Sequence, residues 1–366
     1  MGPWRLFGCL MALPMLAGCS AGVDQISNGG LPTSNVSVAP AASPSFVVEA
    51  RAQVPAGRLP GDVSVSRDGS FAYDFFTVHD GSISRGVVGI QVNRHGLVDT
   101  VRTQPGWFLD SYSFQGAWLA WTETRGVQED PFQGMAWTTR LMDLDTGKIW
   151  ILARSTQDSP VPAGATFLGN RVLLSEYNGI ATKTSTLTWI DLPGLTRHSF
   201  LSRAQLYGFV TNGTELLSTR LVDLGKNPGG ELTAMAAVHA DGTTTDIKRG
   251  RMLNLQAVTH DHILWQEGHR TFVANWPGLA NVRQVSSDHT ELAVLGDDFV
   301  AHLTVGGPQG LGARIESLDA EFSQDLPVPA DQTIRSRISG AGDHLGYITE
   351  TLADQPRYTV VVIRYS

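Results

Sequence analysis

The chain has 366 residues, of which 27 are Lys or Arg and 35 are Asp or Glu, so its formal net charge is −8. Apolar residues make up 42% of the chain, which is enough for a large core and excludes a mainly disordered protein. The acidic balance disfavours a nucleic-acid binder, and the 39 glycines disfavour a long helical bundle because Gly weakens a helix interior.

Residues 1–18 have the pattern of a signal peptide. One cation, Arg5, precedes the apolar run Leu6–Leu16, which is too short to span a bilayer. The four residues that end at Cys19, Leu-Ala-Gly-Cys, resemble the lipobox of bacterial lipoproteins. This resemblance implies cleavage before Cys19, a lipid thioether on its sulfur and acylation of the new amino terminus. A plain secretory signal peptide is the alternative interpretation.

The cysteine count agrees with lipidation. Cys9 and Cys19 are the two cysteines of the chain; the first would be removed and the second would carry lipid. We therefore expect no disulfide, no thiolate nucleophile and no Cys-based metal site in the mature chain. Buried acyl chains contribute about 0.8 kcal/mol per CH₂ to membrane binding. This predicts a protein held by its lipid anchor on the exported side of the cell membrane or of an outer membrane.

Residues 19–45 are rich in Ser, Ala, Gly, Pro and Asn and nearly free of charge. Such a composition cannot bury enough apolar surface to fold, so it predicts a flexible tether after the lipidated residue. No later apolar run approaches 18 residues, and we expect the rest of the chain to be soluble. The folded domain is predicted over residues 46–366.

From residue 46 onward, a unit of about 45 residues recurs along the chain. Each unit has a turn with Asp, Asn or Gly, followed by an apolar strand that ends in polar residues. This period is close to the roughly 40–50 residues of a four-stranded propeller blade. The turns of the successive units centre on Gly69, Gly116, Gly169, Gly213, His260, Gly296 and Gly342.

Two of the turns resemble those of the WD-like and Tol-system propeller repeats. Ser-Arg-Asp-Gly at 66–69 differs from their Ser-Pro-Asp-Gly by lacking the proline, and Asp-Leu-Asp-Thr-Gly at 143–147 fits their Asp-x-x-Thr-Gly. The resemblance implies an all-β propeller, and the count of units predicts seven blades. Six or eight blades stay open, because one step spans only 36 residues. The rival, a two-sheet sandwich, fits a single repeated unit poorly.

The last unit shows three strands, one fewer than a blade needs. The strand-like segment Phe46–Gln53 precedes the first unit and belongs to none of the seven. We predict that it pairs with Tyr358–Arg364, which would close the ring and cover an exposed sheet edge.

Motifs of common active sites are absent from the sequence. Gly-x-Ser-x-Gly, the Walker loop and His-Glu-x-x-His do not occur, and the repeats leave no room for an α/β-hydrolase domain. His260 and His262 could offer two metal ligands on one strand face, but their register favours a turn beside Asp261. We therefore predict no catalytic residue, no metal and no cofactor.

Two further sets of residues have a functional and a structural interpretation. The pairs Asp143/Asp145 and Asp297/Asp298 could suggest calcium, but they lack the further oxygen ligands of calcium loops and favour hairpin turns. Trp107 and Trp276 lie near Gly and Pro and could form a sugar-binding platform. Packing between blades is the favoured role for tryptophans on apolar strands.

The second strands of the units end in polar residues at nearly the same register. If the units are blades, these ends surround one mouth of the channel and form an acidic rim with a local basic spot. Such a rim could bind a cationic ligand, a metal or a basic partner segment. Polar strand ends are also expected simply because loops contact water. The candidate binding rim consists of His79, Glu123, Glu176, Arg220, Glu267, His302 and Glu350, with His269 and Arg270 beside them.

The function predicted from these observations is that of a binding, scaffolding or sensor module. Propellers expose loop-rich faces that host interactions without chemistry. Its partners would be the membrane, through the lipid anchor, and another envelope protein or a small ligand. The alternative is an enzyme at the channel mouth, a lyase or hydrolase acting on glycans or lactones.

Overall fold

The computed structural model describes residues 45–79, 82–125, 136–156, 162–178, 184–223, 231–285, 293–306, 310–318, 322–326, 328–353 and 355–365. The predicted signal peptide, the lipidation site Cys19 and, apart from Ser45, the predicted tether lie outside these residues. The chain divides into a unit of residues 1–43 and a unit of residues 44–366. No helix in the described ranges is long and apolar enough to cross a membrane.

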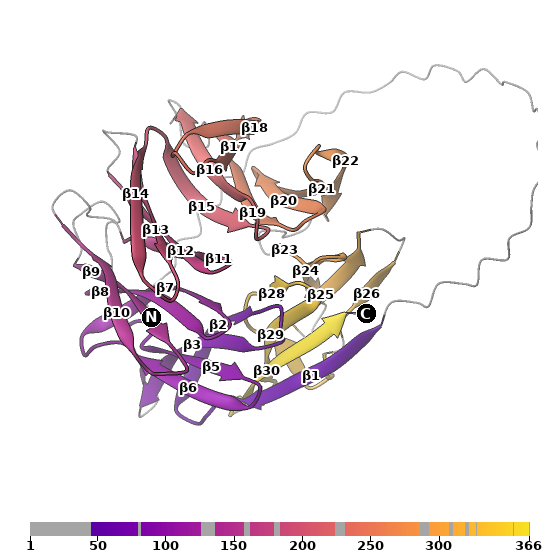
Figure 1. The fold of residues 1–366 in the computed structure, drawn as a ribbon. Helices are drawn as coiled ribbons and strands as arrows, with labels where there is room; N and C mark the ends of the chain where they lie inside the picture. Colours follow the sequence, from indigo (N-terminus) through magenta and orange to yellow (C-terminus); the bar gives the residue numbers. More distant parts are fainter. Residues whose placement is uncertain are drawn as a thin grey trace, which may run out of the picture. The chain divides into compact units, whose positions relative to one another are not determined.

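The second unit is an all-β propeller of seven blades arranged in a ring (Figure 1). Six blades are each formed by consecutive strands of the chain. The first three contain β2 (Arg58–Val65), β3 (Phe71–His79), β5 (Gly89–Arg94) and β6 (Leu97–Arg102); β7 (Trp107–Gln115), β8 (Trp118–Arg125), β9 (Trp137–Asp143) and β10 (Ile149–Arg154); and β11 (Gly164–Leu168), β12 (Arg171–Tyr177), β13 (Ser185–Asp191) and β14 (Thr196–Ser202). The short β4 (Ser82–Ile83) pairs with β3.

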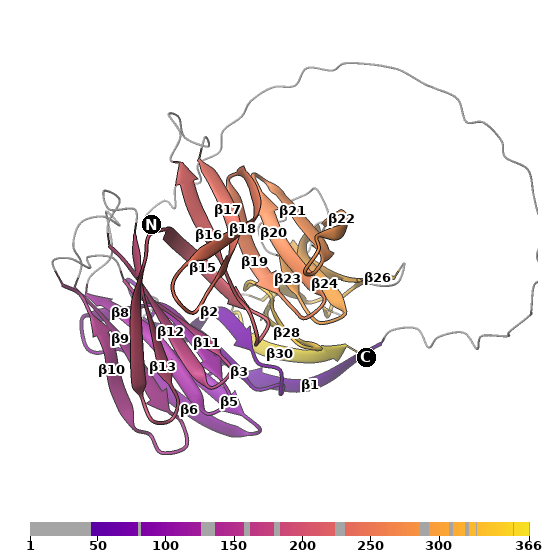
Figure 2. The same ribbon diagram turned by 45° about the horizontal axis from the view of Figure 1, so that its top comes forward.

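Blades 4 to 6 repeat this antiparallel order, with the first strand of each blade nearest the axis (Figure 2). They contain β15 (Gln205–Thr211), β16 (Leu216–Asp223), β17 (Leu232–Val238) and β18 (Thr244–Arg251); β19 (Leu253–Val258), β20 (His262–Glu267), β21 (Arg270–Asn275) and β22 (Ala280–Val285); and β23 (Ala293–Leu295), β24 (Phe299–Gly306), β25 (Gly310–Ser317) and β26 (Ser323–Asp325). The seven-bladed prediction is therefore confirmed.

Blade 7 combines the two ends of the described chain. Its strands are β27 (Gln332–Ile334) and β28 (Ser339–Ala341), which both pair with β29 (His344–Thr351), then β30 (Tyr358–Tyr365) and, outermost, β1 (Phe46–Gln53). The antiparallel register runs from Phe46 opposite Tyr365 to Gln53 opposite Thr359. The N-terminal strand thus closes the ring, as the sequence predicts.

An ion cluster fastens this closing strand. Glu49 lies at a register shift of β1, and its carboxylate contacts His344 Nε2 at 2.7 Å and Arg364 Nε at 3.1 Å. His344 is mostly buried, with 8% of its side chain exposed. Arg364 is on the neighbouring strand β30 and His344 is on β29, so the cluster adds charge-assisted contacts between β1 and both of these strands.

The turns predicted from the repeat join the first and second strands of the blades. At these turns Gly69, Gly116, Gly169, Gly213 and Gly342 have φ between +55° and +95°. Side chains with a Cβ rarely adopt this conformation, so the turn itself explains the recurring glycine.

The hydrophobic core lies between neighbouring blades. One cluster joins Ile90 and Val92 of blade 1 to Leu119 and Trp121 of blade 2, and each of these side chains is at most 2% exposed. The alternation of side chains along each strand places apolar residues against both neighbours. Most aromatic and aliphatic side chains therefore fill the interblade space, while the innermost strands line the axis.

Candidate functional site

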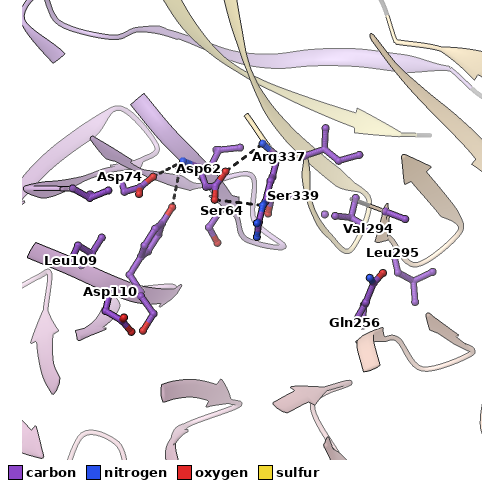
Figure 3. Close-up of a pocket in the computed structure, with 18 residues that line it drawn as sticks. Asp62, Ser64, Asp74, Leu109, Asp110, Gln256, Val294, Leu295, Arg337 and Ser339 are labelled. Carbon is purple, nitrogen blue, oxygen red and sulfur yellow. Dashed lines mark hydrogen bonds and ion pairs between the residues drawn. The ribbon is translucent and has the colours of Figure 1, made fainter. Parts of the chain in front are cut away.

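The innermost strands surround a cavity of about 530 Å³. It is lined by residues of β2, β7, β19 and β23 and by the segment that precedes and begins β28, so five of the seven blades contribute. This composition places the cavity in the axial channel of the propeller. The close-up in Figure 3 shows Asp110 on one wall and Gln256 beside Leu295 on another.

Three of these innermost strands are interrupted by bulges at the cavity. In β2 the register jumps from Pro60 to Val63, which leaves Gly61 and Asp62 outside the regular pairing. In β7 and β19 the residues left outside the pairing are Asp110 and Gln256. A bulge gives up regular pairing and re-aims a side chain, and bulges are frequent beside active sites. The polar groups of this cavity therefore come from local departures from the repeat.

The bulge in β2 brings two carboxyl groups together. The backbone N–H of Asp62 donates a hydrogen bond to Asp74 Oδ1, from the neighbouring strand β3. Gly61 allows this approach, because a Cβ at that position would lie 2.6 Å from the same oxygen. Burial is the main cause that raises the pKa of Asp74 to about 7; the nearby Asp62 carboxylate also raises this pKa, and the N–H donor of Asp62 lowers it.

Arg337 approaches the Asp62 side of this pair. Its Nε lies 3.9 Å from Asp62 Oδ2, and its backbone N–H donates to Asp62 Oδ1 at 3.4 Å. Both side chains stay largely exposed to the channel, at 69% and 52%. The long contact is weak, but it gives the two carboxyls different environments, because the cation is beside Asp62 and Asp74 is half-buried.

Asp110 lies on the wall beside these carboxyls (Figure 3), and Tyr112 of the same strand also lines the cavity. The Tyr112 hydroxyl lies 3.2 Å from the carbonyl oxygen of Asp62 and 3.3 Å from that of Ala72, so it can donate to either. Burial raises the pKa of Tyr112 well above its usual value, and burial also raises the pKa of Asp110. On the opposite wall, Gln256 Oε1 is buried without a hydrogen-bond donor among the described residues.

The arrangement offers hydrogen-bond acceptors and negative charge to a ligand. Asp62 and Asp110 supply carboxylate oxygens, Gln256 supplies an amide oxygen, and Asp74 titrates near neutrality. A group of three or more His, Cys, Asp or Glu side chains placed to hold a metal ion does not occur in the described part of the chain. The cavity can bind a cationic or hydrogen-bond-donating group, and Asp74 can accept or release a proton.

The structure places the candidate rim residues on the second strands of their blades, but in unlike surroundings. Glu123 and His302 are buried, at 1% and 2% exposure, and Glu176 is half-buried. His79 is exposed at the end of β3, and His269 and Arg270 are exposed at the turn between β20 and β21.

The other rim residues form ion pairs with neighbouring strands. Arg220 binds Asp246 with a contact of 2.6 Å, and Glu267 lies 3.2 Å from Lys248. Glu350 contacts Arg335 at 2.9 Å. Ligand binding by this rim remains a prediction.

The ambiguous turn motifs have local partners. His260 is exposed and contacts its neighbour Asp261 at 2.8 Å, whereas His262 is 7% exposed at the start of β20. Asp143 accepts hydrogen bonds from the backbone N–H of Asp145 and from the hydroxyl of Thr146, as in a hairpin turn. These contacts satisfy the residues within their own turns.

Asp297 and Trp276, two further candidates from the sequence, also form contacts with other residues of the chain. Asp297 pairs with Arg67 at 3.0 Å, from the corresponding turn of blade 1. The indole N–H of Trp276 donates to Glu215 at 2.7 Å.

The cavity residues Asp62, Asp74, Asp110 and Gln256 are not among the residues predicted from the sequence. A signal for the first existed, since Pro60-Gly61-Asp62 interrupts an otherwise regular strand pattern, and a Gly inside a strand suggests a bulge. Asp110 and Gln256 lack such a signal, because each is one polar residue in an alternating strand. Their alignment at one cavity depends on the register of separate blades.

Comparison with solved structures supports the propeller architecture. The β-propeller domain of the Trilobed protease from Pyrococcus furiosus matches with a TM-score of 0.60 at 9% identity, covering 84% of this chain and 94% of that one. The acylaminoacyl peptidase of Pyrococcus horikoshii matches with a TM-score of 0.57 at 11% identity, covering 82% of this chain and 50% of the peptidase. At these identities the likeness shows the fold alone.

A third structure, a post-proline cleaving enzyme from Rickettsia typhi, matches with a TM-score of 0.52 at 8% identity, covering 82% of this chain and 51% of that one. The chain thus spans about half the length of these two peptidases. No protein-family model and no curated protein sequence matches the chain.

Proposed function

We propose that this chain is an exported, lipid-anchored protein whose propeller binds a small ligand with a positively charged group in the axial cavity. The observation that carries the proposal is the set of bulges that place Asp62, Asp110 and Gln256 at one cavity. Bulges are frequent beside functional sites, so their position at this cavity supports a binding role.

The charge of the cavity supports a cationic ligand. Asp62, Asp74 and Asp110 line it together with a single cation, Arg337, among the described lining residues. Low-dielectric walls strengthen the attraction between such carboxylates and a positive group. The volume of about 530 Å³ falls within the roughly 300–1,000 Å³ of small-molecule sites.

The ligand proposal is tested with two probes of equal length, putrescine and the uncharged 1,4-butanediol. Titration calorimetry on the full chain in detergent should detect putrescine and not the diol. Asp110→Asn should weaken putrescine binding at least tenfold. Asp145→Asn, at an exposed hairpin, is the control and should change it less than twofold. Equal binding of both probes, or equal binding by Asp110→Asn, contradicts the proposal.

The anchor rests on the resemblance of the residues before Cys19 to a lipobox. A soluble domain on a lipid tether would present its binding site to ligands or envelope proteins near the membrane. Cys19→Ala should abolish lipid attachment and move the protein to the soluble fraction or leave it uncleaved. Normal cleavage with retention in the membrane would show that the lipobox interpretation is wrong. Crosslinking of the lipidated protein in membranes would identify a protein partner.

A second candidate function, an enzyme at the channel mouth, is favoured by one observation. Asp74, whose pKa is raised to about 7, lies beside Asp62, which faces Arg337. Carboxyls with unlike pKa values can share the acid and base roles in hydrolysis or elimination on glycans and lactones. Turnover of such a substrate that is lost in Asp74→Asn but kept in Asp145→Asn would favour this function. Turnover unchanged by Asp74→Asn would exclude Asp74 as its acid or base.

A further inference from the structure

A second cavity, separate from the axial channel, lies in blade 2 and has the opposite charge. Its volume is about 400 Å³. Arg140 and Arg154 line it from β9 and β10, together with Gln104 and Ser155 from neighbouring connections. The described lining residues include no Asp or Glu. This cleft therefore presents hydrogen-bond donors and positive charge.

Arg140 is held in place by a buried carboxyl. Its side chain is 15% exposed, and its Nε lies 3.5 Å from Oε1 of Glu123, which is 1% exposed. The indole N–H of Trp121 donates to the same oxygen at 2.7 Å. The Nε–Oε1 contact is an ion pair without a hydrogen bond, so Glu123 compensates the charge of Arg140 and lies beside its guanidinium. This contact gives Glu123 a role in the wall of a cleft.

Arg154 supplies a second positive charge to the cleft. Its side chain is exposed at the end of β10, and it forms no ion pair with any described residue. Among the described residues, these two guanidinium groups outnumber the single carboxylate beside them, Glu123, which contacts Arg140. Guanidinium groups bind carboxylates in a planar, bidentate geometry, so an anion of this type fits the site.

The rest of the lining indicates the body of the ligand. Trp107 is half-buried and Ile151 is 38% exposed, so an apolar wall faces the cleft beside the arginines. The indole of Trp107 offers a flat apolar face against which the C–H groups of a sugar ring can pack. The hydroxyl and amide groups of Ser155 and Gln104 can exchange hydrogen bonds with ligand hydroxyls.

We propose that this cleft binds a sugar acid, with its carboxylate at Arg140 and Arg154 and its ring against Trp107. The proposal is independent of the cationic ligand assigned to the axial cavity, because the two cavities share no lining residue. It gives the protein a second, anion-selective site on the side of one blade.

The test is calorimetric titration of the full chain in detergent with three probes. Glucuronate should bind at least tenfold more tightly than glucose, which lacks the carboxylate, and more tightly than benzoate, which lacks the hydroxyls. The ratio of the glucuronate affinity to the glucose affinity should fall as salt is added, because salt screens the attraction between the carboxylate and the exposed guanidinium of Arg154. Equal binding of glucuronate and glucose, or of glucuronate and benzoate, overturns the proposal.

Variants locate the site. Arg154→Gln should weaken glucuronate binding at least tenfold, whereas Arg203→Gln, at an exposed position between blades 3 and 4, should change it less than twofold. Arg154 is exposed, so its replacement is expected to leave the melting temperature nearly unchanged. Arg154→Lys should recover part of the affinity through its charge. Unchanged affinity in Arg154→Gln overturns the assignment, while putrescine binding reports separately on the axial cavity.

Discussion

Two partly buried carboxyls in different blades have opposite properties. In blade 6, Glu316 accepts hydrogen bonds from Arg283 at 2.8 Å and from His302 at 3.1 Å. The hydrogen bond from His302 is the main cause that lowers the pKa of Glu316 to about 2. In blade 1, Asp74 has a backbone N–H donor and a neighbouring carboxylate, and burial raises its pKa to about 7.

The opposite pKa shifts indicate that Glu316 has a structural role, whereas Asp74 is a candidate for a functional one. Arg283 belongs to β22 of blade 5, so its bond to Glu316 joins two blades, and the charges compensate each other. Asp74 has no described cation within ion-pair distance and faces a cavity. Charged groups that the fold leaves uncompensated are concentrated at functional sites, where they lower stability.

The largest expected effect comes from removing the compensated charge. Glu316→Gln leaves Arg283 and the buried His302 without their carboxylate; because Arg283 is 37% exposed, we expect a cost at the low end of the range for buried pairs, about 3 kcal/mol. Chemical denaturation at pH 7 should show a loss of this size. The matched Glu176→Gln, on a half-buried strand of blade 3, should lose far less. Equal losses in both variants would show that the interblade pair adds little.

The pH dependence of stability should show both carboxyls with opposite signs. The folded pKa of Glu316, about 2, is below its usual 4.5, so its contribution exists above pH 4.5 and is lost as pH falls from 4.5 to 2. The folded pKa of Asp74, about 7, is above its usual 3.8, so its contribution exists below pH 3.8 and is lost as pH rises to 7. Each loss should be about 3 kcal/mol or less.

Those losses are measured as the free energy of unfolding across pH 2 to 8. Asp74→Asn should abolish the fall between pH 4 and 7, while Glu316→Gln should abolish the fall below pH 4.5. A fall between pH 4 and 7 that persists in Asp74→Asn would assign it to other groups.

At a single pH, Asp74→Asn should stabilise the protein. Above pH 7 the native carboxyl is charged, partly buried and next to Asp62, so the neutral amide removes both the desolvation cost and the repulsion. We expect a gain of about 2 kcal/mol at pH 8. Asp145→Asn, at an exposed turn, serves as the control. A loss of stability in Asp74→Asn would mean that its hydrogen bond from Asp62 outweighs the burial of charge.

The smallest effect on stability is expected for a substitution at Gly61, the glycine that leaves space for the Asp74 carboxyl. In Gly61→Ala the new methyl would lie 2.6 Å from Asp74 Oδ1, so the carboxyl has to move, at a cost of about 1 kcal/mol. In the matched Gly164→Ala the nearest atom, Ser175 Oγ, is 3.7 Å away, an ordinary contact. The two variants are compared by their melting temperatures and by the pKa of Asp74, measured by NMR titration. Equal melting temperatures and an unchanged pKa would show that the bulge tolerates a side chain.

The sequence by itself predicted a seven-bladed propeller, with six or eight blades left open, and identified the closing strand. Glycines at one turn of the repeat need positive φ, which is a local property of the backbone, and they recur at the blade period. Phe46–Gln53 could be identified because the last unit lacked a strand and a sheet edge requires a partner. The repeat and the closing strand can be predicted because the first depends on local backbone conformation and the second on the number of strands that a blade needs.

Only the tertiary structure decided where the chemistry lies. Glu123 and Glu267 have the same position in the repeat, yet Glu123 is buried beside Arg140, and Glu267 is half-buried beside Lys248 of the preceding blade. Asp110 and Gln256 meet at one cavity because bulges in separate blades shift the register there. Burial and proximity across blades depend on how the sheets pack around the axis, and no periodicity in the chain encodes them.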